Sequence, residues 1–202
     1  MKAKATQIIT EESVDALLAR IKSCDLCQQQ LPLPAKPILQ FGENSKILIA
    51  GQAPGKAAHD KGIPFDDISG DRLRAWLGVN RTQFYQTDNF ALVPMGFCFP
   101  GNGKSGDLSP LPICAQVWRT QILSRLNQVE LTLVLGKYAI DWHMCSKQTV
   151  TEQVKNWQTL LAANTLVLPH PSPRNNIWLK RNPWFEQQIL PILKRKVSQV
   201  LK

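Results

Sequence analysis

The chain has 202 residues, a formal net charge of +9 at pH 7 and five cysteines. This length supports one domain with a sizeable core, and no apolar stretch approaches the roughly 20 residues of a membrane-spanning helix. We therefore predict a single domain over residues 1–202 and exclude a membrane-spanning protein. The basic segment Met1–Thr6 leads into Glu11 and Glu12 rather than into an apolar signal core, so we expect a cytoplasmic monomer with reduced thiols.

Short apolar runs and helical patterns alternate along the chain. Buried strands are predicted at Lys46–Ala50, Phe90–Val93, Leu131–Leu135 and Thr165–Leu168. Helices are predicted after a Thr10 cap, at Asp71–Leu77, Pro112–Leu126, Lys137–Met144 and Thr151–Ala162, and from an Asn182 cap and Pro183 to about Val200. This alternation predicts a three-layer α/β/α sandwich around a mainly parallel four-stranded sheet.

Two loop motifs follow the first and last predicted strands. The turn Gly51–Gly55 has the sequence Gly-Gln-Ala-Pro-Gly, and the loop His170–Asn175 reads His-Pro-Ser-Pro-Arg-Asn. Ligands of open parallel sheets bind outside the carboxyl ends of the strands, so both motifs belong to one cleft. The segment Met95–Leu111, rich in glycine and proline, is too long for a plain connection and is expected to be functional or disordered.

Four of the five cysteines form two pairs. Cys24 and Cys27 are spaced Cys-x-x-Cys, while Cys98 and Cys114 flank the long loop. Four thiolates complete a tetrahedral sulfur site, suited to zinc or to an iron–sulfur cluster, and the spacing does not separate the two. The alternative is that these residues are small buried hydrophobes, as we expect for Cys145.

Taken together and in this order, these motifs resemble those of the iron–sulfur, family 4-like members of the uracil-DNA glycosylase superfamily. The resemblance runs from about Cys24 to about Pro191. It implies a DNA-repair hydrolase that flips a deaminated base, uracil or a related one, and cleaves its N-glycosidic bond. It also implies that Cys24, Cys27, Cys98 and Cys114 hold a [4Fe-4S] cluster, with zinc as the alternative.

The resemblance also assigns roles within the cleft. His170 corresponds to the residue that stabilises negative charge on the departing base, and Phe65 to the aromatic that stacks on that base. The first motif, with Gln52 and Ala53, corresponds to the region that positions water and contacts the base. The loop residues implied to contact DNA are Pro171, Ser172, Pro173 and Arg174.

Two positions depart from the family pattern. Active relatives carry an acid at the second or third position of the first motif, where this chain has Gln52 and Ala53. The candidates to replace that acid are His59, Asp60, Asp66 and Asp67, of which we assign Asp60 to catalysis. The base-reading asparagine expected at the end of the second strand is also missing, and the nearest amide, Asn89, is assigned to base binding.

The net charge of +9 favours a polyanionic partner, because Lys and Arg neutralise phosphates in nucleic-acid complexes. We expect the partner to be DNA that contains damaged or deaminated bases. The alternatives are a catalytically weak or inactive DNA-binding member of the superfamily, and a zinc-stabilised nucleotide-binding protein with no role on DNA.

Overall fold

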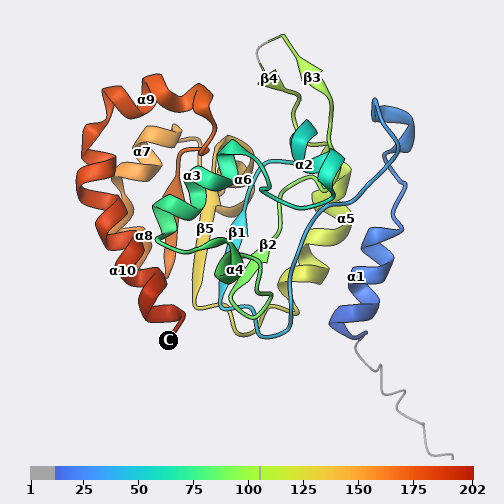
Figure 1. The fold of residues 1–202 in the computed structure, drawn as a ribbon, viewed down its shortest axis with the longest axis horizontal. Helices are drawn as coiled ribbons and strands as arrows, with labels where there is room; N and C mark the ends of the chain where they lie inside the picture. The colour runs from blue at the N-terminus through green and yellow to red at the C-terminus, as the bar shows by residue number, and fades with distance from the viewer. Residues whose placement is uncertain (1–11, 105) are drawn as a thin grey trace, which may run out of the picture.

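The computed structural model describes residues 12–104 and 106–202 of the protein. Its main sheet has the order β2-β1-β5-β6, and all neighbouring strands are parallel (Figure 1). The strands are β1 (Ile47–Ala50), β2 (Phe90–Leu92), β5 (Leu131–Leu135) and β6 (Thr165–Leu168). The four predicted strands and their parallel arrangement are thus confirmed.

Two hydrophobic cores pack against the sheet. Alternate residues of β1 point to opposite faces, so Ile47 and Ile49 join one core while Leu48 joins the other. The first core is shared with α3 (Ile68–Leu77), α6 (Lys137–His143) and α10 (Leu190–Val200). The second is shared with α1 (Val14–Lys22) and α5 (Pro112–Leu123), at the right of Figure 1. The predicted three-layer α/β/α fold is confirmed.

Several helix boundaries differ from the prediction. The helix expected over Thr151–Ala162 is divided into α7 (Val150–Lys155) and α8 (Trp157–Ala162), with Asn156 between them in a non-helical conformation. The last helix opens with a π-helical turn, η3 (Phe185–Ile189), before α10. Pro191 lacks the N–H needed for the regular helical bond, which accounts for the irregular start.

The N-terminal helix begins at Val14 and is capped by Ser13, whose hydroxyl accepts from the backbone N–H of Ala16 at 3.2 Å. The Thr10 cap lies outside the described residues. Shorter elements that the sequence did not predict are η1 (Gln28–Gln30), α2 (Lys56–Lys61), α4 (Arg81–Phe84), η2 (Pro173–Asn175) and α9 (Asn176–Arg181). Among the helices of residues 12–104 and 106–202, none has the length and apolar character that a membrane span requires.

The long loop after β2 contains a small hairpin. Its strands, β3 (Asn102–Gly103) and β4 (Gly106–Asp107), pair antiparallel and project at the top of Figure 1. The carbonyl of Gly101 accepts from the backbone N–H of Leu108 at 2.8 Å, which closes the base of the hairpin. Part of this loop therefore has regular structure, and the hairpin carries Gly106 and Asp107 toward the cleft.

Candidate active site

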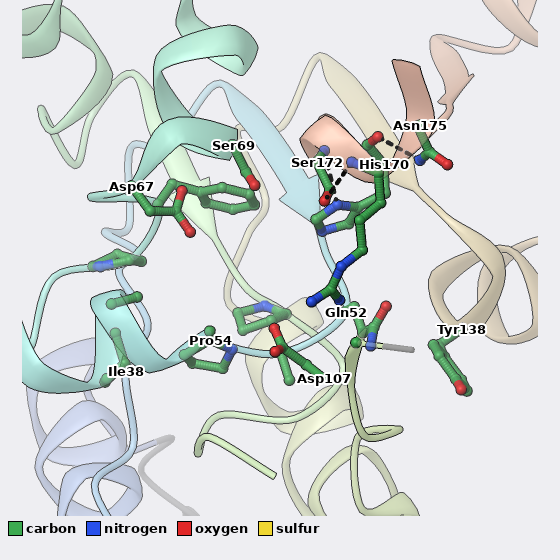
Figure 2. Close-up of a pocket in the computed structure, with 18 residues that line it drawn as sticks. Ile38, Gln52, Pro54, Asp67, Ser69, Asp107, Tyr138, His170, Ser172 and Asn175 are labelled. Atoms are coloured by element: carbon green, nitrogen blue, oxygen red, sulfur yellow. Dashed lines mark hydrogen bonds between the residues drawn. The ribbon is translucent and has the colours of Figure 1, made fainter. Parts of the chain in front are cut away.

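One cavity of about 320 Å³ lies at the carboxyl edge of the sheet. The chain runs from β1 to one edge strand, β2, and from β5 to the other edge strand, β6. Such a switch point between adjacent strands is where open α/β sheets bind ligands. Residues that follow all four strands meet there with the hairpin, as Figure 2 shows for most of them. The lining residues used below are Gln52, Ala53, Gly55, Phe65, Asp67, Ser69, Pro94, Gly106, Asp107, Tyr138, His170, Ser172, Arg174 and Asn175.

His170 follows β6 and has a defined tautomer. Its Nδ1 accepts a hydrogen bond from the backbone N–H of Ser172 at 3.2 Å, and its carbonyl accepts from the Asn175 side chain at 2.7 Å. Burial lowers the pKa of the imidazole, and the nearby carboxylates of Asp67 and Asp107 act in the opposite direction. A neutral ring with Nδ1 as acceptor carries its proton on Nε2. His170 is therefore a neutral N–H donor in the wall of the cavity.

The loop after His170 is anchored from two directions. Arg72 donates to the carbonyl of Ser172 at 3.1 Å, and the Ser172 hydroxyl accepts from the backbone N–H of Arg174. The Arg174 guanidinium lies against Gly106 of the hairpin, where an added Cβ would meet its Nη1 at 1.9 Å. Gly106 also has a φ of +144°, a conformation that glycine adopts without strain. The hairpin and the His170 loop are thus in contact at one side of the cavity.

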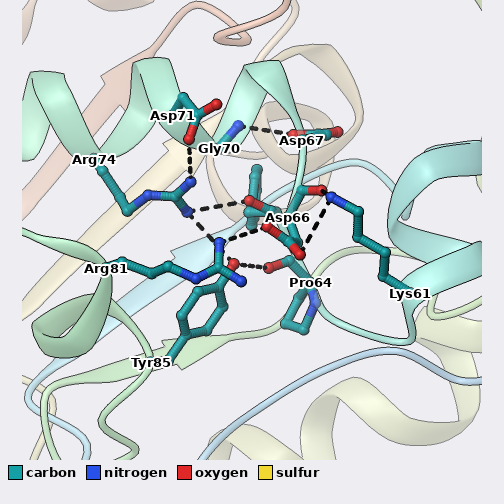
Figure 3. A network of polar contacts seen from close by, with 10 residues as sticks. Lys61, Pro64, Asp66, Asp67, Gly70, Asp71, Arg74, Arg81 and Tyr85 are labelled. Carbon is teal, nitrogen blue, oxygen red and sulfur yellow. Dashed lines mark hydrogen bonds and ion pairs between the residues drawn. The ribbon is translucent and has the colours of Figure 1, made fainter.

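Phe65 lines the cavity from a left-handed backbone conformation, with a φ of +55°. Its carbonyl accepts a hydrogen bond from Arg74 at 3.2 Å, and the carbonyl of the preceding Pro64 accepts from the Tyr85 hydroxyl at 2.9 Å (Figure 3). A Cβ at Gly70 would lie 1.7 Å from the Phe65 carbonyl oxygen, so only glycine fits there. These contacts hold a backbone conformation that a bulky residue rarely adopts.

The turn after β1 is held against the segment that follows the hairpin. Gln52 donates from Nε2 to the carbonyl of Leu108 at 3.3 Å. A Cβ added at Gly55 would lie 3.3 Å from Oδ2 of Asp107 and 3.8 Å from Oδ2 of Asp67. Two carboxylates therefore converge over this turn, one from the hairpin and one from the start of α3. The other oxygen of Asp67 caps α3 by accepting from the Gly70 N–H at 2.8 Å.

The cavity brings together most of the predicted site residues. Gln52, Ala53, Phe65, His170, Ser172 and Arg174 line it, whereas Pro171 and Pro173 belong to the same loop without lining the cavity.

Two of the assigned residues, Asp60 and Asn89, lie outside the cavity. Asp60 lies on α2 outside the cavity and pairs with Lys56 at 2.6 Å, because the helix places both side chains on one exposed face. Asn89 precedes β2, and its amide donates to the Gln83 carbonyl at 3.0 Å and to Gln86 at 2.7 Å. It does not line the cavity either.

Sequence reasoning missed three residues with polar side chains in the cavity wall: Asp107, Ser69 and Tyr138. Asp107 lies in a loop expected to be functional, but no local pattern distinguishes it from other loop residues. Of the other candidate acids, Asp66 forms ion pairs with Arg81 and Lys61, which lower its pKa to about 2. Asp67 is the one candidate acid from the sequence that reaches the cavity.

The four paired cysteines line a second, much smaller cavity of about 20 Å³ between the N-terminal segment, the long loop and α5. Burial is the main cause, and the neighbouring thiols a smaller one, that raises the pKa of Cys98 to about 11 and that of Cys114 to about 12. Trp118 donates its indole N–H to Sγ of Cys24 at 3.4 Å. Within the described residues, no group of three or more His, Cys, Asp or Glu is arranged to hold a metal ion.

Arg119 lies on α5, which also carries Cys114 of the smaller cavity, and contacts the end of β2 beside the larger cavity. Its guanidinium is buried and donates to the carbonyls of Val93 at 3.1 Å and Pro94 at 3.2 Å. It also contacts Nε2 of His143, and burial lowers the pKa of Arg119 to about 10. Since Pro94 lines the larger cavity, the position of α5 determines part of the wall of the cleft.

Comparison with known families gives a match over residues 39–194 to the family described as Uracil DNA glycosylase superfamily. The match covers most of the chain and takes in the turn after β1, the hairpin and the His170 loop. It supports a DNA glycosylase-type function. It begins after Cys24 and Cys27, so it does not bear on the cysteine site.

Proposed function

Because the chain belongs to the uracil-DNA glycosylase superfamily, we propose that it is a DNA-repair glycosylase that hydrolyses the N-glycosidic bond of a flipped, deaminated base, uracil or a related one. The observation that carries this proposal is the neutral Nε2–H donor of His170 in the cavity wall, beside Phe65 and two carboxylates. Catalysis needs a preorganised hydrogen-bond donor at the base oxygen, because the base leaves as an anion, whereas a protein that only binds DNA does not need this donor.

In this proposal the cavity receives an extruded base. Phe65 stacks on the base, and the bonds to its backbone and to Pro64 keep the ring in place. His170 donates from Nε2 to the base oxygen that gains negative charge as the glycosidic bond breaks. A neutral imidazole suits this role, because it donates without first having to be charged in a buried site.

The cavity wall lacks the asparagine that is expected to recognise the base edge. The end of β2 contributes Pro94, and the amides near the base are those of Gln52 and Asn175, both already hydrogen-bonded to backbone carbonyls. A bidentate contact to a base edge is worth about 1–3 kcal/mol of discrimination. We therefore propose that the enzyme accepts several deaminated bases.

DNA binding is assigned to the rim of the cavity. Arg174 and Lys104 meet at an open hollow formed with Asn102, Gly103 and Gly106, where a phosphate has two cationic side chains within reach. Pro171 and Pro173 stiffen the adjoining loop, as a wedge against a duplex requires. The net charge of +9 supplies the general attraction to phosphates.

We further propose that Cys24, Cys27, Cys98 and Cys114 hold a [4Fe-4S] cluster of the family 4-like kind. The donor set fits, because four thiols from three segments surround one enclosed space. A single zinc ion needs sulfurs about 3.5–4 Å apart, while a cluster spaces them about 6–7 Å apart. The resemblance of these four cysteines to the cluster ligands of the family 4-like members favours the cluster over zinc. Its role would be structural, because it ties the N-terminal segment to α5 and, through Arg119, to the cleft.

The second candidate is a catalytically weak or inactive DNA-binding member of the superfamily. It is favoured by Gln52, which stands where active relatives carry an acid and whose amide is bonded to Leu108.

A base-release panel separates the two functions. Single- and double-stranded oligonucleotides with uracil, hypoxanthine or xanthine are incubated with excess protein, and the abasic product is measured. We expect release of at least one base, and His170→Ala should slow it by roughly 10²–10³-fold, as for other lost oxyanion donors.

His59→Ala is the matched control, because its imidazole does not line the cavity. The DNA affinity of His170→Ala should barely change. If the wild-type protein binds DNA but releases none of the bases, the binding function is the better account.

A further inference from the structure

The turn after β1 lacks its own acid, but a carboxylate from elsewhere lies over it. Asp107, on β4 of the hairpin, places Oδ2 within 3.3 Å of the point where a Gly55 Cβ would be. The bond from Gln52 to the Leu108 carbonyl joins the residue next to Asp107 to the same turn. The acid missing at Gln52 or Ala53 is thus replaced in space by one that lies more than fifty residues later in the chain.

Of the two carboxylates that line the cavity in the described part of the chain, Asp107 is the one with no other role in the fold. Asp60 pairs with Lys56, Asp66 pairs with Arg81 and Lys61, and Asp67 caps α3. In the described part of the chain, the Asp107 carboxylate makes no hydrogen bond or ion pair, although it lines the cavity and faces His170 closely enough to affect its pKa. A carboxylate that is free in the resting protein is available to bind water.

Resting on the proposed glycosylase function, we propose that Asp107 is the catalytic carboxylate that binds and activates the hydrolytic water. The water oxygen attacks C1′ of the deoxyribose while the C1′–N bond breaks, and the bonding electron pair leaves with the base. The water proton passes to Asp107. The base anion is stabilised by the Nε2–H of His170 and takes a proton from solvent, so the products are the free base and an abasic sugar.

The hairpin therefore acts as part of the active site. Its Gly106 lies against the Arg174 guanidinium, so the hairpin contacts the His170 loop directly. The two catalytic groups, Asp107 and His170, come from these two segments. Their contact keeps the water-activating carboxylate and the base-oxygen donor on the same cavity.

The test compares two isosteric substitutions. Asp107→Asn keeps the shape of the side chain and removes its ability to accept a proton, and the exposed hairpin position should leave folding intact. Asp88→Asn is the matched control, because this exposed aspartate precedes β2 and lies outside the cavity. We expect Asp107→Asn to lower the single-turnover rate of base release by roughly 10²–10⁴-fold, the usual contribution of a general base. Asp88→Asn should leave the rate unchanged.

Two further readouts separate catalysis from a structural effect. DNA affinity, measured by fluorescence anisotropy, should be unchanged or tighter in Asp107→Asn, because a negative charge beside the phosphates is lost. Adding Gln52→Glu to Asp107→Asn should restore part of the rate, since it returns an acid to the same turn. If the wild-type protein releases base and Asp107→Asn is equally fast, or if Asp88→Asn is as slow as Asp107→Asn, the role of Asp107 is overturned while the glycosylase function stands. A wild-type protein that releases no base would overturn the glycosylase function and this inference together.

Discussion

Gly70 should not tolerate a side chain, although it lies inside a helix. Alanine is normally favoured over glycine there by about 1 kcal/mol. In this protein an added Cβ would lie 1.7 Å from the carbonyl oxygen of Phe65 and 2.9 Å from its Cβ. Ordinary contacts begin near 3.4 Å, so the Phe65 backbone would have to move and the bond from Arg74 to its carbonyl would be lost.

The expected cost follows from these contacts. Overpacking a filled site costs about 1–3 kcal/mol, and losing the hydrogen bond to the part-buried Phe65 carbonyl costs about 1 kcal/mol more. After the gain in helix propensity, Gly70→Ala should lower the free energy of unfolding by about 1–3 kcal/mol. Because Phe65 lines the cavity, single-turnover base release should fall as well.

Urea unfolding and the base-release assay measure these two effects. Ile68→Ala is the control on the same helix, since its side chain is 68% exposed and its loss should change stability by less than about 0.5 kcal/mol. If Gly70→Ala were instead more stable than the wild type by about 1 kcal/mol, helix propensity alone would describe the site. The tight contact between α3 and the Phe65 loop would then be refuted.

Three further predictions concern the cysteine site, DNA binding and pH. Cys98→Ser should lose bound iron and melt at a lower temperature, while Cys145→Ser, at an exposed position, should keep both the iron content and the melting temperature. Equal iron content in the two variants would refute the proposed cluster. Lys104→Ala should weaken binding to all DNA sequences alike and reduce the salt slope of the affinity by about one, and an unchanged slope would exclude a phosphate at the hairpin. Burial lowers the pKa of His143 to about 3, whereas the unfolded chain takes up a proton at this residue below about pH 6.5. The contribution of His143 to stability is therefore complete above about pH 6.5 and declines as the pH falls. The free energy of unfolding should change with pH by up to about 1.4 kcal/mol per pH unit, and urea unfolding between about pH 6.5 and 4 should show a weaker pH dependence in His143→Gln.

Local patterns in the sequence were sufficient for the sheet. The strands β5 and β6 have the predicted bounds, Leu131–Leu135 and Thr165–Leu168, because continuous apolar runs bounded by turn residues are strong signals. Once the strands are parallel, their carboxyl ends share one edge, which places the Gly51–Gly55 turn and His170 in the same cleft. The sequence patterns did not predict the helix interruptions that depend on a single residue, such as the break at Asn156 and the irregular turn before Pro191.

The sequence by itself thus determined the layers, the edge of the sheet that carries the cleft, and the residues that lie directly after its strands. Only the tertiary structure decided which acids reach that cleft. Asp60 turns outward to Lys56, and Asp107 reaches the turn at Gly55 from a hairpin far along the chain. The reason is physical: periodicity reports which face of an element is buried, whereas the direction of a loop side chain depends on contacts between segments distant in sequence.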